Sequence, residues 1–179
     1  MRIAISGSHL VGKTTLAEAL ARALPGYELV PEPYHLLEED GYEFAEMPSF
    51  EDFALQLERS IQCVQESGTR VVFDRCPLDI LGYLVTHRDA DAFQSEDWMP
   101  RVREAVSKLD VIVFVPVEDP DRVAIPRSQA RLRSDVDRVL RDIIVDDAYG
   151  LEIDVIPAAG TLGARLRQVL AHLQSAGGS

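Results

Sequence analysis

One short segment near the amino terminus, Gly7-Ser8-His9-Leu10-Val11-Gly12-Lys13-Thr14, limits what this chain can fold into more than any other feature. It matches the pattern G-x-x-x-x-G-K-[ST], in which glycines let the backbone curl so that successive N–H groups point at phosphate oxygens. An apolar, β-branched run precedes the segment and a helical pattern follows it, as such a loop requires. A glycine turn with an incidental lysine is the alternative. The pattern predicts a binding site for a nucleoside triphosphate.

In this pattern the lysine reaches the β and γ phosphates and the hydroxyl that follows it holds magnesium. We therefore expect Lys13 to contact ATP and Thr14 to bind Mg²⁺. The helix that begins here adds the positive end of its dipole. The residues expected to bind the phosphates of ATP are Gly7, Ser8, His9, Leu10, Val11, Gly12, Lys13, Thr14 and Thr15.

Short apolar runs alternate with helical patterns along the rest of the chain. The runs predict strands at Arg2–Ser6, Tyr27–Pro31, Arg70–Asp74, Val111–Pro116 and Leu151–Ile156. The segments between them predict helices at Lys13–Leu24, Phe50–Ser67, Pro77–His87, Glu96–Leu109, Asp135–Ala148 and Leu162–Leu173. Alternating strands and helices form a parallel sheet with helices on both faces. We expect an α/β three-layer sandwich with five parallel strands and a ligand crevice at their carboxyl ends.

Length and charge exclude several classes of protein. A chain of 179 residues suits one domain, which we place at residues 1–174, followed by a disordered tail at 175–179. The 18 basic and 30 acidic residues give a net charge of −12. A protein that binds nucleic acid needs a basic face, so this charge disfavours nucleic acid as the partner. No apolar run approaches the roughly 20 residues that cross a bilayer. With two cysteines and no signal-peptide pattern, the expected location is the cytoplasm.

Charged residues follow the second and third predicted strands. Asp74 ends a buried strand, where its carboxylate can position magnesium; the alternative is a helix cap. Arg75 suits an anionic or hydroxyl-bearing acceptor, and a structural ion pair is its alternative. Glu32 lies between two prolines that fix its direction, so it can act as a general base for an acceptor hydroxyl. An exposed turn glutamate is the alternative for Glu32.

With these residues in view, the chain resembles P-loop small-molecule kinases of the deoxynucleoside and nucleotide kinase group. The motifs Gly7–Thr14, Val30-Pro31-Glu32-Pro33 and Phe73-Asp74-Arg75-Cys76-Pro77 occur in the order typical of that group. More closely, the chain is similar to bacterial AAA-type ATPase or kinase-like domains related to ribosylnicotinamide kinases. The resemblance implies a P-loop NTPase fold that carries an arginine-bearing lid.

The resemblance also implies roles for single residues. Glu32 would be the base, Asp74 the magnesium partner and Arg75 the clamp on the acceptor. Cys76 stands where the group commonly has serine, so a hydroxyl contact is missing. A buried small side chain is a better interpretation of Cys76 than a nucleophile.

A lid is expected at about residues 118–134, where four arginines fall within twelve residues and two prolines interrupt helix. Arginines on a closing segment neutralise charge on a phosphoryl group in transfer. The candidates are Arg127, Arg131 and Arg133; a solvated helix face is the alternative. The acceptor site would contain Glu32, Tyr34, Phe53, Gln56 and Arg75, with ordinary core packing as the alternative for the aromatic residues.

These features predict an ATP- and Mg²⁺-dependent phosphotransferase that moves the γ-phosphoryl group to a hydroxyl of a small, nucleoside-like acceptor. No guanine-reading Asn-Lys-x-Asp follows the fourth predicted strand, which separates the chain from switch GTPases. The alternative is a nucleotide-binding regulatory ATPase without a small-molecule acceptor. A nucleic-acid end kinase is disfavoured by the acidic charge, and a homodimer stays open.

Overall fold

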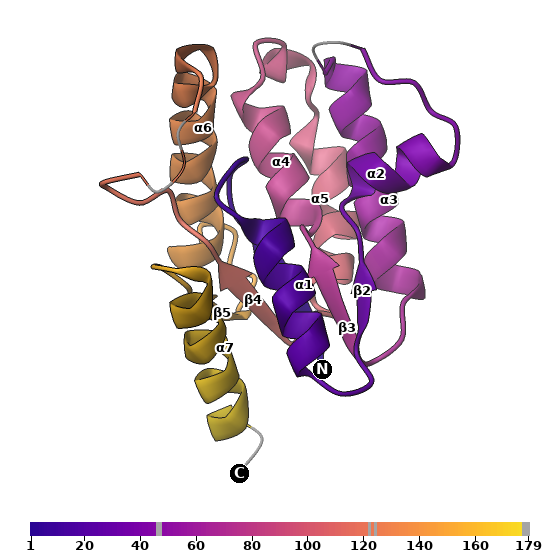
Figure 1. Ribbon diagram of the computed structural model, residues 1–179. Helices are drawn as coiled ribbons and strands as arrows, with labels where there is room; N and C mark the ends of the chain where they lie inside the picture. Colours follow the sequence, from indigo (N-terminus) through magenta and orange to yellow (C-terminus); the bar gives the residue numbers. More distant parts are fainter. Residues whose placement is uncertain (46–47, 122, 124, 177–179) are drawn as a thin grey trace.

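The computed structural model describes residues 1–45, 48–121, 123 and 125–176. Five parallel strands form one sheet in the order β2-β3-β1-β4-β5 (Figure 1). The strands are β1 (Arg2–Ser6), β2 (Glu28–Val30), β3 (Val71–Asp74), β4 (Val111–Phe114) and β5 (Asp154–Pro157). Because β1 pairs with both β3 and β4, the loop that follows β1 lies between the ends of these two strands. The expected five-stranded parallel sheet is confirmed.

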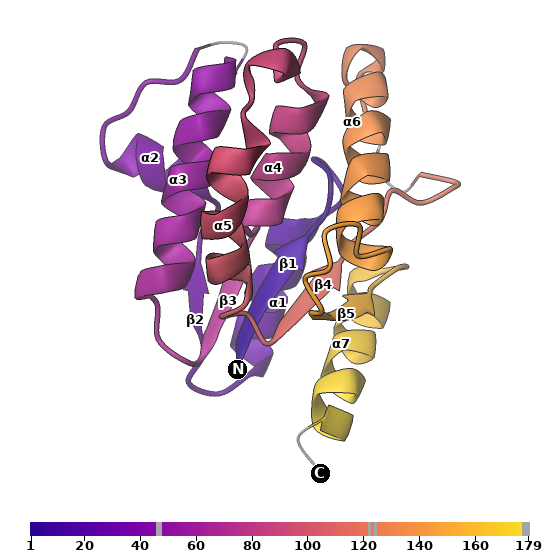
Figure 2. The same ribbon diagram turned by 180° about the vertical axis from the view of Figure 1, so that it is seen from behind.

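Helices cover both faces of the sheet (Figures 1 and 2). On one face lie α1 (Lys13–Ala23) and α7 (Leu162–Ala176). The other face carries α3 (Phe50–Glu66), α4 (Pro77–Thr86), α5 (Ser95–Val106) and α6 (Arg127–Leu140). A short helix α2 (Pro33–Glu39) follows β2, and a π-helical turn at Arg141–Val145 continues α6. Among the described residues, no helix has both the length and the apolar character needed to cross a membrane.

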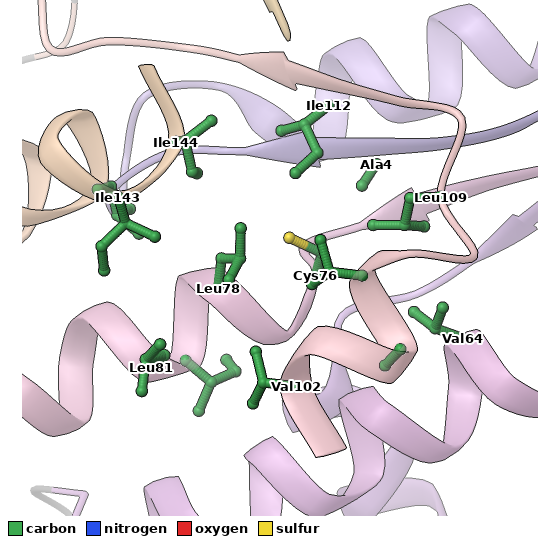
Figure 3. Close-up of a cluster of buried hydrophobic side chains, with 14 of the residues drawn as sticks. Ala4, Val64, Cys76, Leu78, Leu81, Val102, Leu109, Ile112, Ile143 and Ile144 are labelled. Carbon is green, nitrogen blue, oxygen red and sulfur yellow. The ribbon is translucent and has the colours of Figure 1, made fainter. Parts of the chain in front are cut away.

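Side chains of the central strands are buried on both faces, as the uninterrupted apolar runs predicted. In β1, Ile3 and Ile5 pack toward α1 and α7, whereas Ala4 packs toward the four helices of the opposite face. Figure 3 shows Cys76 inside the cluster of buried side chains between the sheet and these four helices, near Leu78. Cys76 is fully buried, and burial raises the pKa of its thiol well above the usual value. The thiol is therefore a packing group.

Several element boundaries differ from those expected. α6 begins at Arg127, well before Asp135, so the three arginines expected to act in the lid, Arg127, Arg131 and Arg133, lie on this helix. β5 begins at Asp154 because the carboxylate of Asp147 accepts hydrogen bonds from the amides of residues 151 and 152 and holds them in a turn. α7 continues through Ala176, so residues 175 and 176 are helical where a disordered tail was expected, and residues 177–179 lie outside the described part of the chain.

α2 was not expected from the sequence. It begins at Pro33, a residue whose fixed φ suits the first turn of a helix, and Glu32 precedes it with extended backbone angles. Glu32 therefore lies at the amino-terminal end of α2, two residues after β2 ends at Val30, at the carboxyl edge of the sheet. The next helix, α3, starts with a capping box in which Ser49 and Asp52 each bond the other's backbone amide. The two helices pack together and form one wall of the site described below.

Candidate active site

The loop between β1 and α1 needs both of its glycines. Gly7 has a φ of 149°, and a Cβ at this position would lie 2.3 Å from the carbonyl oxygen of Val115. Gly12 has a φ of 86°, in the left-handed region, directly before α1. The backbone therefore curls around the amino-terminal end of α1, where free N–H groups and the helix dipole attract anions. All residues expected to bind phosphate, from Gly7 to Thr15, lie in this loop or in the first turn of α1.

Lys13 is the first residue of α1 and is almost fully buried. Its Nζ donates a hydrogen bond to the carbonyl oxygen of Ser8 at 2.6 Å, so the ammonium group closes over the curled loop. Burial, and then the nearby charge of Arg75, lower the pKa of Lys13 to about 7, although Asp79 and Glu32 oppose this shift. A phosphate oxyanion bound here would favour the charged form of the lysine.

Thr14 and Asp74 meet where β3 ends beside the loop, near enough for the Thr14 hydroxyl to stabilise the ionised carboxylate. Asp74 is buried, and its Oδ1 has no hydrogen-bond partner among the described residues. Burial raises the pKa of Asp74, and the Thr14 hydroxyl opposes that shift. A buried carboxylate oxygen beside a threonine hydroxyl fits Mg²⁺, which takes oxygen ligands and completes its shell with phosphate oxygens and water. No group of three or more His, Cys, Asp or Glu in the described ranges is arranged to hold a metal ion.

Glu32 and Arg75 form an ion pair across the cleft from the loop. The Nε of Arg75 donates a hydrogen bond to Oε2 of Glu32. Burial raises the pKa of Glu32 and is the largest single effect, but the charge and hydrogen bond of Arg75, together with the charges of Lys13 and His35, outweigh it, so the pKa lies below its usual value. Arg75 has a φ of 81°, its guanidinium lies 5.4 Å from the ring centre of Tyr83, and its buried Nη1 has no partner within the described part of the chain. The pair therefore presents an ionised carboxylate and an unpaired N–H donor.

A cavity of about 730 Å³ lies next to this pair. The residues expected to contact an acceptor all line it, namely Glu32, Tyr34, Phe53, Gln56 and Arg75. The rings of Phe53 and Tyr83 stack with their centres 5.2 Å apart and their planes 8° apart, and both residues line the cavity. The Nε2 of Gln56 donates to the carbonyl oxygen of Asp52 at 3.3 Å. The structure thus brings together side chains from α2, α3 and α4 at one side of the phosphate loop.

His9 and Tyr83 are among the residues of this cavity that were not predicted to belong to it. His9 is part of the phosphate loop, yet its side chain lines the cavity, and its Nδ1 lies 3.0 Å from the hydroxyl of Tyr83. Burial, followed by the charges of Arg75, Lys13 and Arg133, lowers the pKa of His9 to about 4. At neutral pH the imidazole is therefore uncharged. Tyr83 lies in the middle of the apolar helix α4. Its sequence context is typical of an ordinary core residue, so nothing in the sequence indicated that it lines the cavity.

The three arginines expected in the lid have different surroundings. The side chain of Arg127 lies outside the described residues. Arg131 is exposed and lies 3.7 Å from Asp135 on the same helix. Arg133 is buried, where its Nε donates to the carbonyl oxygen of His9 at 2.9 Å and its Nη2 to that of Leu10 at 3.1 Å. Arg133 therefore contacts the backbone of the phosphate loop itself.

Comparisons with known proteins agree with this geometry. A family model described as an AAA domain matches residues 2–165. Comparison with curated protein sequences gives no significant match. A solved deoxyadenosine kinase from M. mycoides is similar with a TM-score of 0.68 and 15% identity, over 98% of this chain and 99% of that one.

Two further solved structures show the same fold. Thymidylate kinase from Candida albicans has a TM-score of 0.64 and 15% identity, over 97% of this chain and 91% of that one. NadR in complex with NR has a TM-score of 0.69 and 16% identity, over 99% of this chain and 51% of that one. The α/β P-loop NTPase fold that the resemblance implied is confirmed.

Proposed function

The chain belongs to the AAA-domain family, and on that premise we propose that it is an ATP- and magnesium-dependent phosphotransferase. Its acceptor is a hydroxyl group on a small, nucleoside-like molecule. Solved proteins of the same fold include a deoxyadenosine kinase and a thymidylate kinase, which supports this class of reaction. The phosphate loop with Lys13 and Thr14 supports the use of a nucleoside triphosphate.

The observation that carries the proposal is the cavity of about 730 Å³ between the phosphate loop and α3. A regulatory ATPase needs a binding site for the nucleotide alone, whereas a phosphotransferase also needs a cavity that holds an acceptor beside the γ-phosphate. The cavity is bounded by His9 of the loop at one side and by Phe53 at another, and it contains the Glu32–Arg75 pair. It has the size of ordinary small-molecule sites.

Each residue has a part in the reaction. The loop amides and Lys13 hold the β and γ phosphates. Magnesium held by Thr14 and Asp74 would neutralise negative charge on the phosphate oxygens. Glu32 accepts the proton of the acceptor hydroxyl as that oxygen bonds to the γ-phosphorus. The bond to the bridging oxygen breaks in the same step, and ADP leaves.

The low pKa of Glu32 suits this role at neutral pH, because the carboxylate is ionised and ready to accept a hydrogen bond. Loose transition states of phosphoryl transfer need orientation of the nucleophile more than strong basicity. Arg75 holds Glu32 through its Nε and keeps Nη1 for the acceptor. The positive charge of Arg75 is offset by Glu32, which favours an uncharged acceptor over an anionic one.

The aromatic side chains of Phe53 and Tyr83 in the cavity lining favour an acceptor with a planar ring, since aromatic rings pack well against one another. Gln56 also lines the cavity, where its carbonyl oxygen can accept a hydrogen bond from the ring. A hydroxyl at the opposite end of the acceptor would then lie beside Glu32. Nucleosides have both features.

Incubation with ATP, Mg²⁺ and a panel of nucleosides, nucleotides, sugars and aminoglycoside-like alcohols tests the proposal. We expect ADP release that depends on one class of acceptor, together with an acceptor heavier by one phosphoryl group in the mass spectrum. ADP release that is independent of every acceptor, with no phosphorylated product, would favour the regulatory ATPase instead.

A further inference from the structure

Two buried arginines hold three consecutive carbonyl groups of the phosphate loop. Arg133 of α6 donates to the carbonyl oxygens of His9 and Leu10, at 2.9 and 3.1 Å. Arg165 of α7 donates from its Nη1 to the carbonyl oxygen of Val11 at 2.6 Å. Both side chains are nearly inaccessible to solvent. The loop is thus bonded to helices on the two opposite faces of the sheet.

These bonds determine where the loop amides point. In a planar trans peptide the C=O and the following N–H point in opposite directions. When the carbonyls of residues 9, 10 and 11 point at the arginines, the amides of residues 10, 11 and 12 point away from them, toward the inside of the curl. We propose that Arg133 and Arg165 are positioning residues that keep the phosphate loop in its phosphate-binding conformation before a nucleotide arrives.

Acidic partners show that orientation, and not added charge, is the contribution of these arginines. Arg133 is paired with Asp121, and Arg165 with Glu118 at 2.7 Å. Each guanidinium charge is therefore offset by a carboxylate from the connection between β4 and α6. Glu118 also accepts a hydrogen bond from the amide of Gly160 at 2.7 Å, which anchors the Arg165–Glu118 ion pair to the turn before α7.

The two pairs lie side by side around one small void. This space of about 10 Å³ is lined by Val11, Pro116, Glu118, Asp121, Arg133 and Arg165. Ser8 adds a further tie, because its hydroxyl donates to the backbone carbonyl of Arg133 at 2.9 Å. Glu118, Asp121, Arg133 and Arg165 thus form a brace for the loop; the first three come from the segment interpreted from the sequence as a lid, and Arg165 comes from α7.

The inference rests on the triphosphate binding of the proposed function but needs no acceptor. Binding of the magnesium complex of the imido analogue of ATP is measured by calorimetry for the wild type and for Arg133→Met and Arg165→Met. We expect the dissociation constant to rise about tenfold or more in each variant, because a hydrogen bond from a charged donor is lost and the loop must be ordered on binding. Arg138→Met on α6 and Arg167→Met on α7 replace exposed arginines of the same helices, and these controls should change the constant less than twofold.

Two further variants separate orientation from charge. Arg165→Lys keeps the charge but loses the paired donors, so its affinity should stay close to that of Arg165→Met. Asp121→Ala makes the surroundings of the loop more positive. A pure charge effect would tighten binding in this variant, whereas loss of the brace weakens it. Full recovery in the lysine variant, or tighter binding in Asp121→Ala, would overturn the inference.

A merely structural role is recognised by other readouts. It would lower the melting temperature and the number of binding sites per chain while leaving the dissociation constant of the folded molecules unchanged. In the transfer reaction, the brace predicts a higher KM for ATP with kcat and the KM of the acceptor nearly unchanged.

If the methionine variants do not fold, the Arg165→Lys and Asp121→Ala variants serve as the test. Failure of the wild type to bind the analogue would overturn the proposed function itself, whereas wild-type affinity in both methionine variants would overturn only the brace.

Discussion

The backbone amide of Gly7 donates a hydrogen bond to Oδ1 of Asp79 at 2.9 Å, which ties the start of the phosphate loop to the first turn of α4. The other carboxylate oxygen of Asp79 accepts from the amide of Cys76 at 2.9 Å. The side chain is completely buried. One carboxylate therefore joins the segment after β1 to the segment after β3, next to Asp74 and Arg75, for which we propose magnesium and acceptor roles.

Replacing this carboxylate should destabilise the fold. Asp79→Ala leaves two buried amides without their partner, and each unsatisfied group costs about 1–3 kcal/mol. We expect the free energy of unfolding to fall by at least about 2 kcal/mol in urea denaturation. Asp146→Ala, at an exposed position, is the matched control and should change it by less than about 0.5 kcal/mol. Equal stability of the two variants would contradict the role given to Asp79.

Glu32→Gln should separate transfer from nucleotide binding. The amide keeps the shape of the side chain but cannot accept the hydroxyl proton. We expect phosphorylation of the acceptor to fall about 100-fold or more, while the dissociation constant for ATP stays within about threefold. Glu39→Gln, an exposed position on α2, should behave as the wild type. Unchanged transfer in Glu32→Gln would remove Glu32 from the reaction.

The affinity for the triphosphate should depend on pH through Lys13. In the nucleotide-free protein Lys13 has a pKa of about 7, and a bound phosphate favours its charged form. Above pH 7, binding of the triphosphate is therefore coupled to the uptake of a proton by Lys13. The affinity should consequently fall as the pH rises above 7, by up to about tenfold per pH unit, and level off below pH 7. Calorimetric titrations between pH 7 and 9 measure this change.

Lys13→Arg provides the control for the pH dependence, because a guanidinium stays charged over this range. Its affinity for the triphosphate should be nearly constant between pH 7 and 9, whatever its absolute value. A wild-type protein whose affinity is equally flat would show that Lys13 is fully charged before the nucleotide binds.

Asp74→Asn should raise the magnesium requirement. The amide oxygen is a weaker and uncharged ligand, whereas the buried Oδ1 of the wild type is available beside the Thr14 hydroxyl. We expect the Mg²⁺ concentration for half-maximal transfer to rise about tenfold. Thr14→Ser retains the hydroxyl and should shift it far less. The same magnesium dependence in Asp74→Asn and the wild type would leave Asp74 as a structural residue only.

The elements with the strongest sequence signals were predicted well. The uninterrupted apolar runs at 71–73 and 111–115 became buried central strands, because such runs are stable only with both faces covered. The start of α6 and the helix α2 were missed. Both begin next to a proline, a residue that marks a helix start as readily as a break, so the local pattern alone could not decide between the two.

The acceptor site was predictable only in part. Glu32 and Arg75 follow strand ends, and parallel strands end at one edge of the sheet, so their proximity followed from the topology. No sequence pattern indicated that His9 and Tyr83 line the cavity. Which face of a helix or loop borders a cavity depends on the elements packed against it, and these are distant in the sequence. The same holds for Arg133, whose expected contact with a transferring phosphoryl group is replaced in the structure by contacts with the loop backbone.

The sequence by itself determined the phosphate loop and the fold class, a five-stranded parallel sheet with helices on both faces, because a curled glycine loop and buried strands depend on local backbone freedom and apolar patterning. Only the tertiary structure decided which charged groups meet. Asp79 reaches Gly7 across 72 residues, and Arg165 reaches Val11 across 154. Such bonds depend on how helices pack against the sheet, and no spacing within the chain encodes them.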